Sequence, residues 1–147
     1  MQDVQAIKEG LRDGTIDVIA TDHAPHATQE KQQEFTEAPF GIVGLETALS
    51  LTLALVDEGV LTLESAVDKL APAPAKAFSL NAGTLAVGAP ADVAIVDPNR
   101  EWQVDPSRFR SKSRNTPFAG WKVRGRVTTT IVSGRVVFEL DRSERQA

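Results

Sequence analysis

The chain has 147 residues, 16 Lys+Arg against 20 Asp+Glu for a formal net charge of −4, and no cysteine. Without cysteine there is no disulfide framework, no Cys-ligated zinc or iron–sulfur site and no thiolate nucleophile. An acidic chain without a long basic run is not expected to bind nucleic acid. Its longest apolar stretch, residues 48–56, is far shorter than the ~20 residues that cross a bilayer, and its start does not resemble a secretory signal. We therefore expect a cytoplasmic protein without a membrane span.

The first 20 residues predict a helix followed by a buried strand. Val4, Ile7 and Leu11 recur at helical spacing, which favours a helix over about residues 3–12 that ends before Gly14. Residues 16–20 form a short β-branched run, typical of a strand that is buried on both faces. A helix followed by a buried strand is half of an α/β repeat.

A polar segment, residues 21–41, separates this unit from further helices. A loop of about 20 residues is uncommon in a compact domain and usually has a function. Residues 44–58 are apolar on most sides and predict a helix that is enclosed rather than exposed on one face. Thr62 suits the N-cap of a short helix to Leu70, and Pro74 suits the first turn of another.

The helical period stops after residue 81, and short strands follow. They are expected at residues 83–85, 91–96, 101–104, 123–132 and 135–138, with Ser133 and Gly134 as a hairpin turn. The sequence thus predicts an α/β part over residues 1–80 and an all-β part over residues 81–147. Neither part looks self-sufficient, because a closed (β/α)8 barrel needs about 250 residues. We expect the chain to be the C-terminal part of a larger protein.

The residues best suited to chemistry gather directly after the predicted strand. Asp22 lies where parallel α/β proteins present catalytic side chains, and a carboxylate there can bind a divalent metal or act as a general base. The alternative is an aspartate that only caps the turn after the strand. His23 and His26, the only histidines of the chain, lie within four residues of Asp22. A tightly held zinc needs three or four protein ligands, so further ligands must come from outside this cluster.

Two sequence blocks resemble the C-terminal barrel segment of bacterial dihydroorotases, which are zinc-dependent members of the amidohydrolase superfamily. They are A-T-D-H-A-P-H at residues 20–26 and A-P-F-G-I-V-G-L-E-T at residues 38–47. Residues 83–93 and 115–138 resemble segments that dihydroorotases share with hydantoinases and allantoinases. The resemblance implies an α/β fold, the last part of a (β/α)8 amidohydrolase barrel followed by strands of a small β-sandwich domain.

The resemblance also implies an activity and roles for individual residues. The family interconverts L-dihydroorotate and N-carbamoyl-L-aspartate in pyrimidine synthesis by opening or closing a cyclic amide. In the family, the aspartate that matches Asp22 binds Zn²⁺ and carries a proton. The groups that match His26 and the Phe40–Gly41 backbone contact the substrate carboxylate. His23 has no implied ligand role, and we interpret it as a residue that orients the loop.

Several features of the family have no counterpart in this sequence. The H-x-H pair of the first barrel strand, the later metal-binding histidines and the Arg and Asn that hold the substrate are missing, and Met1 stands where the family continues upstream. We therefore predict that the 147-residue chain alone has no dihydroorotase activity and no tight zinc site.

Two alternatives to dihydroorotase stay open from the sequence. One is a related cyclic amidohydrolase, such as a hydantoinase, dihydropyrimidinase or allantoinase. The other is a non-catalytic, dihydroorotase-like partner of aspartate transcarbamoylase. Because an incomplete barrel leaves strand edges and apolar surface open, we also expect association into homo-oligomers.

Overall fold

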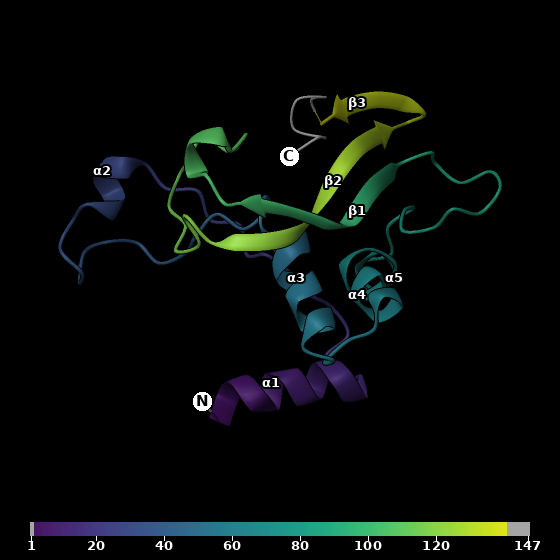
Figure 1. The fold of residues 1–147 in the computed structure, drawn as a ribbon, viewed down its shortest axis with the longest axis horizontal. Coiled ribbons are helices and arrows are strands. Elements are labelled where there is room, and N and C mark those ends of the chain that lie inside the picture. The colour runs from purple at the N-terminus through teal and green to yellow at the C-terminus, as the bar shows by residue number, and fades with distance from the viewer. Residues whose placement is uncertain (1, 141–147) are drawn as a thin grey trace.

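The computed structural model describes residues 2–140 and comprises two regions, a group of helices and an antiparallel sheet. In Figure 1, α3 runs between the sheet and α1, with α4 and α5 at its side. The described helices are too short to cross a membrane. The elements in chain order are α1 (Gln2–Asp13), α2 (Thr28–Lys31), α3 (Ala48–Asp57), α4 (Leu63–Leu70), α5 (Pro72–Ala77), β1 (Val93–Gln103), the 3₁₀ helix η1 (Pro106–Arg108), β2 (Lys122–Val132) and β3 (Arg135–Glu139).

The helices follow the sequence signals closely. The predicted helix over residues 3–12 is α1, and Gly14 follows it with a φ of 84°. Thr62 caps α4 as expected, because its side-chain oxygen accepts a hydrogen bond from the Ser65 N–H at 3.1 Å. The helix predicted over residues 44–58 is shorter, since residues 45–47 form a turn before α3.

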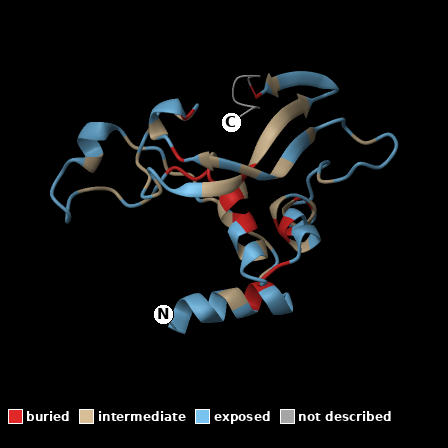
Figure 2. Cartoon of the chain, in the orientation of Figure 1, coloured by how far each residue is buried: buried red, intermediate tan, exposed pale blue. Residues whose placement is uncertain are grey.

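The residues that the structure describes cover α3 only in part, so its enclosure on most sides stays a prediction. Only Ser50, Thr52 and Leu53 of α3 are buried, and two of these side chains are polar. Figure 2 shows buried residues on α3 and near its two ends, while β3 is largely exposed. Apolar side chains of α3 therefore remain accessible on the faces that do not meet the sheet or α4.

The strand predicted over residues 16–20 does not form. The segment is extended but belongs to no strand within residues 2–140. A buried parallel strand needs hydrogen-bonding neighbours on its edges, and here the Ile19 N–H donates instead to the Lys69 carbonyl at 3.0 Å. The Lys69 ammonium donates to the Ile16 carbonyl, so α4 holds this segment in the place of a neighbouring strand.

The three strands form one antiparallel sheet in the order β1-β2-β3. Val93 pairs with Ile131 and Gln103 with Lys122, while Thr129 pairs with Glu139. The two strands predicted over residues 91–96 and 101–104 are one strand, β1, whose register shifts between Asp97 and Glu101. Residues 83–85 form no strand.

The β2–β3 hairpin confirms the predicted turn at Ser133 and Gly134. Their φ angles are 49° and 75°, and positive values at both central residues are those of a type I′ turn. Within residues 2–140 the strands form one three-stranded sheet, so the sandwich over residues 81–147 stays a prediction.

The helices and the sheet meet where α3 packs against β2. Ser50 Oγ donates to the Gly125 carbonyl at 2.7 Å, and Trp102 Nε1 donates to the same carbonyl at 3.1 Å. Gly125 has a φ of +87°, and a Cβ there would lie 2.1 Å from Leu53 Cδ1. At the end of α3, Asp57 pairs with Arg124, whose hydrogen bond lowers the pKa of the Asp57 carboxyl. This joint places the loops that precede α3 beside the sheet region.

Candidate active-site segment

The predicted site lies where residues 21–26 run beside residues 40–44. The Ala24 N–H donates to the Ile42 carbonyl at 2.9 Å, and His23 and Ile42 form an isolated parallel bridge. Gly41 has a φ of +101°, and a Cβ at this position would lie 2.5 Å from the Ala24 Cβ. At Gly44 a Cβ would lie 3.0 Å from the Thr21 Cβ and carbonyl oxygen. The glycines of the second block thus permit a backbone approach that larger residues would prevent.

Asp22 presents an accessible carboxylate at the end of the extended segment. The residue is exposed and has a φ of 44°, and its carboxylate makes no hydrogen bond or ion pair with residues 2–140. A carboxylate without such partners can act as one metal ligand or accept a proton. The described residues include no group of three or more His, Asp or Glu that could hold a metal ion. Asp22 therefore suits zinc as a single oxygen ligand within a larger ligand set.

His23 connects the Asp22 loop to the start of α3. Its Nδ1 accepts the N–H of Gly44 at 3.1 Å and that of Leu45 at 3.4 Å. Because Nδ1 accepts, the proton of the neutral ring lies on Nε2. These are contacts that a loop-orienting histidine would make, and they occupy one of its two nitrogens.

His26 faces the second block, as the predicted set of substrate-binding residues requires. Its Nε2 lies 2.8 Å from the Phe40 carbonyl oxygen, to which it donates, and its Nδ1 lies 3.8 Å from Glu30 Oε2. The structure thus brings His26 and the Phe40–Gly41 backbone together, and the Phe40 side chain is exposed. In this arrangement Nε2 is engaged with the Phe40 carbonyl, so any other acceptor would have to replace that partner.

Two residues that the sequence did not single out complete the loop pair. Lys31 Nζ donates to the carbonyls of Pro39 at 2.7 Å and Gly41 at 3.3 Å. The side chain of Asn115 reaches both blocks from the region between η1 and β2. No local pattern marks either contact, because both depend on tertiary structure.

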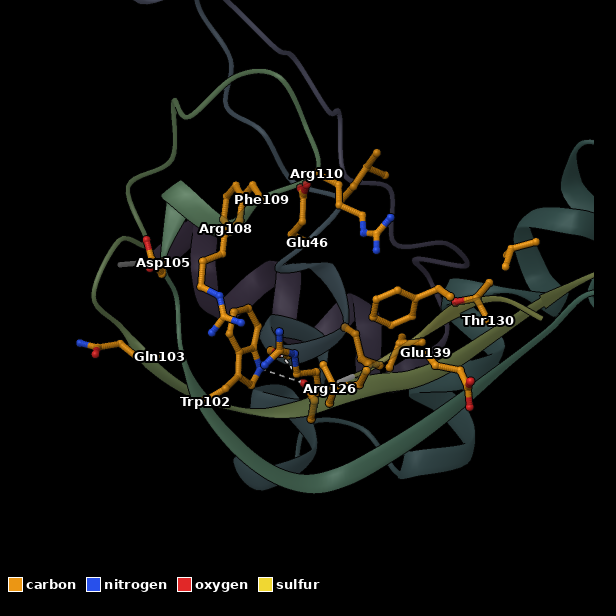
Figure 3. Close-up of a pocket in the computed structure, with 18 residues that line it drawn as sticks. Glu46, Trp102, Gln103, Asp105, Arg108, Phe109, Arg110, Arg126, Thr130 and Glu139 are labelled. Carbon is orange, nitrogen blue, oxygen red and sulfur yellow. Dashed lines mark hydrogen bonds between the residues drawn. The ribbon is translucent and has the colours of Figure 1, made fainter. Parts of the chain in front are cut away.

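A separate open cleft of about 640 Å³ lies between the start of α3 and the sheet. Figure 3 shows Arg126 beside Trp102 within this cleft, and the Arg126 Cζ lies 5.2 Å from the Trp102 ring centroid. Burial, followed by the nearby charges of Arg108 and Arg100, lowers the pKa of Arg126. The predicted site residues Asp22, His26, Phe40 and Gly41 do not line this cleft.

Comparison with known proteins assigns the chain to a family. The sequence model of the amidohydrolase family matches residues 2–137. The chain belongs to the amidohydrolase family. A dihydroorotase of Syntrophotalea carbinolica is 57% identical to it over 138 residues, which are 94% of this chain and 32% of the relative. A dihydroorotase of Syntrophus aciditrophicus is 53% identical over 140 residues, 95% of this chain and 33% of the relative. This amidohydrolase chain thus spans about a third of the length of the curated relatives it matches.

Solved structures of two hydantoinases share the fold. A D-hydantoinase superimposes with a TM-score of 0.84 and 26% identity, covering 94% of this chain and 32% of that structure. An L-hydantoinase (dihydropyrimidinase) from Arthrobacter aurescens gives a TM-score of 0.83 and 38% identity, covering 90% and 31%. The predicted fold class, part of an amidohydrolase (β/α)8 barrel with strands of a small β-domain, is confirmed by these similarities.

Proposed function

We propose that this chain is a segment of a zinc-dependent dihydroorotase, which reversibly hydrolyses the cyclic amide of L-dihydroorotate to N-carbamoyl-L-aspartate in pyrimidine biosynthesis. The observation that carries the proposal is the 53–57% identity to dihydroorotases over nearly the whole chain. The hydantoinase structures are 26–38% identical over a similar share of the chain. The proposal includes a cytoplasmic location and assembly into homo-oligomers.

In this proposal Asp22 binds the metal and carries the proton that the amide nitrogen gains or loses. Its carboxylate is exposed and unengaged by residues 2–140, which leaves it available for both tasks. Zinc, when bound, acts as a Lewis acid and lowers the pKa of a bound water to about 7. Asp22, as the neighbouring base, would hold the proton that passes to or from the ring nitrogen.

His26 and the Phe40–Gly41 backbone bind the substrate carboxylate in this proposal. An imidazole N–H is a strong donor to an anion, and the bond is stronger when the ring is protonated. The 2.8 Å contact between His26 Nε2 and the Phe40 oxygen keeps the two groups on one side of the loop pair. A carboxylate-bearing ring would exploit this pair, whereas an unsubstituted hydantoin carries no carboxylate for them to bind.

The test is an assay of the complete enzyme that contains this segment, with dihydroorotate and hydantoin measured side by side. We expect turnover of dihydroorotate, with kcat/KM at least about 100-fold above that for hydantoin, because a site built around a charged group rejects analogues that lack it. Preference for hydantoin would overturn the proposal in favour of the related amidohydrolases. Absence of turnover on both, with co-purification of an aspartate transcarbamoylase, would favour a non-catalytic partner. The isolated 147-residue chain is expected to be inactive.

A further inference from the structure

Asn115 joins the two blocks of the predicted site from a distant part of the chain. Its side-chain Nδ2 donates to the Ala24 carbonyl at 2.9 Å and to the Gly41 carbonyl at 3.2 Å. Its Oδ1 accepts the His26 N–H at 3.4 Å, and its own carbonyl accepts the Val43 N–H at 3.0 Å. The three partners of the side chain lie 74 to 91 residues away along the sequence.

These contacts agree on one orientation of the amide. A primary amide offers two N–H donors and one acceptor oxygen. Here both donors meet carbonyls, one from each block, and the oxygen meets an N–H. Rotating the amide by 180° would place its oxygen against two carbonyl oxygens and its N–H₂ against a donor. The side chain is therefore matched to its three partners in chemistry as well as position.

The two blocks are otherwise joined by one isolated backbone bridge and by the side chains of two histidines. Within the described residues they share one backbone hydrogen bond, from the Ala24 N–H to the Ile42 carbonyl. Lys31 reaches only the second block. From the first block, His23 bonds to the backbone at Gly44 and Leu45, and His26 Nε2 bonds to the Phe40 carbonyl at 2.8 Å. Asn115 differs from these histidines because it lies outside both blocks and bonds to each of them.

We propose that Asn115 is a positioning residue for substrate binding, which holds the His26 loop and the Phe40–Gly41 backbone at a fixed separation. This inference rests on the proposed function, since it assigns these groups to the substrate carboxylate. Asn115 itself contacts no reacting atom in this account. Its amide sets where the imidazole and the Gly41 backbone stand before the substrate arrives, so that neither has to be ordered on binding.

The kinetic test uses Asn115→Asp in the complete enzyme, with Asn81→Asp as a matched control at an exposed asparagine. The aspartate has nearly the same shape but replaces both N–H donors with an oxygen that faces the two carbonyls. We expect the KM for dihydroorotate to rise about tenfold or more, with kcat within about threefold, because ground-state binding is lost. A fall in kcat at unchanged KM would show a structural role and overturn the inference, as would unchanged kinetics.

Hydrogen exchange of the same proteins, followed by mass spectrometry, provides a readout that needs no activity. In Asn115→Asp we expect faster exchange in peptides covering residues 21–43 and unchanged exchange in α1 and the β2–β3 hairpin. Unchanged exchange in residues 21–43 would overturn the inference. If the wild-type enzyme does not turn over dihydroorotate, the proposed function fails, and the exchange data alone decide whether Asn115 holds the two blocks together.

Discussion

The sheet and the loop pair in front of α3 are stabilised in different ways. The strands β1, β2 and β3 pair with one another through backbone hydrogen bonds, and consecutive strands are neighbours. The loop pair has one isolated bridge and depends on side chains such as His23 and Asn115 and on glycines that permit close approach. The region with the candidate chemistry is thus the one that its own backbone supports least, and its geometry depends on residues elsewhere in the chain.

The largest expected effect on stability comes from Gly41→Ala, which tests the close approach of the two blocks. The positive φ of Gly41 disfavours any side chain by about 1–2 kcal/mol, and overpacking adds about 1–3 kcal/mol. We expect the free energy of unfolding of the complete enzyme to fall by about 3 kcal/mol in urea titrations.

Gly59→Ala is the matched control for this prediction. Gly59 also has a positive φ, of 69°, but a Cβ there would meet nothing within 4 Å. We expect a loss of about 1 kcal/mol, from the backbone conformation alone. Equal losses in the two variants would show that the approach to Ala24 is unimportant and would remove the contrast between the loop pair and the rest of the fold.

A smaller effect is expected from Ser50→Ala, which tests the joint between α3 and the sheet. The substitution removes the buried hydrogen bond to the Gly125 carbonyl and the bond that Ser50 Oγ accepts from Trp102 Nε1 at 3.1 Å. Trp102 Nε1 still donates to the Gly125 carbonyl. We expect a loss of about 1 kcal/mol in the free energy of unfolding. Ser113→Ala is the control, because the Ser113 hydroxyl makes no hydrogen bond with residues 2–140. A loss no greater than that of the control would mean that apolar packing, and not the Ser50 hydroxyl, stabilises the contact between α3 and the sheet.

The smallest effect concerns Glu46, which connects the loop pair to the segment after η1. Burial raises the pKa of its carboxyl. The hydrogen bond from the Ser111 N–H at 2.8 Å and other contacts lower the pKa by more than burial raises it, so the net pKa lies below the ordinary 4.5. A lowered folded-state pKa stabilises the fold at pH values above the ordinary pKa, and this stabilisation is lost as the pH falls through the lowered value.

Glu46→Gln should therefore destabilise the enzyme at pH 6–7, with a difference from wild type that shrinks below about pH 4.5. Thermal unfolding followed across this pH range checks the prediction. Glu37→Gln removes a carboxylate from an exposed loop position and controls for the change in net charge. A pH-independent difference between wild type and Glu46→Gln would show that ionisation of this carboxyl does not contribute.

The sequence predicted the locally determined elements and missed the non-local ones. The β2–β3 hairpin was predictable because Ser133 and Gly134 mark the turn between adjacent runs of β-branched residues. The prediction of a strand over residues 16–20 was wrong, because a β-branched run can form a parallel strand only beside neighbours that hydrogen-bond to it. In this chain the Lys69 carbonyl takes the Ile19 N–H instead.

The candidate site shows the same division. Asp22 and His26 stood out because they lie directly after an apolar run, and the resemblance added Phe40 and Gly41. The structure places His26 against the Phe40 carbonyl. The side-chain contacts of Asn115 span 74 to 91 residues of sequence, and no periodicity or turn signal encodes a contact at that separation.

The central claim is that the Asp22 carboxylate carries the chemistry of a dihydroorotase, and Asp22→Asn in the complete enzyme tests it most directly. The amide keeps the size of the side chain but is a poorer metal ligand and does not accept the proton. We predict that kcat for dihydroorotate falls by about 10²–10⁴-fold, while Asp17→Asn, at another exposed aspartate of the same segment, stays within about threefold of wild type. A kcat for Asp22→Asn within threefold of wild type would contradict the account.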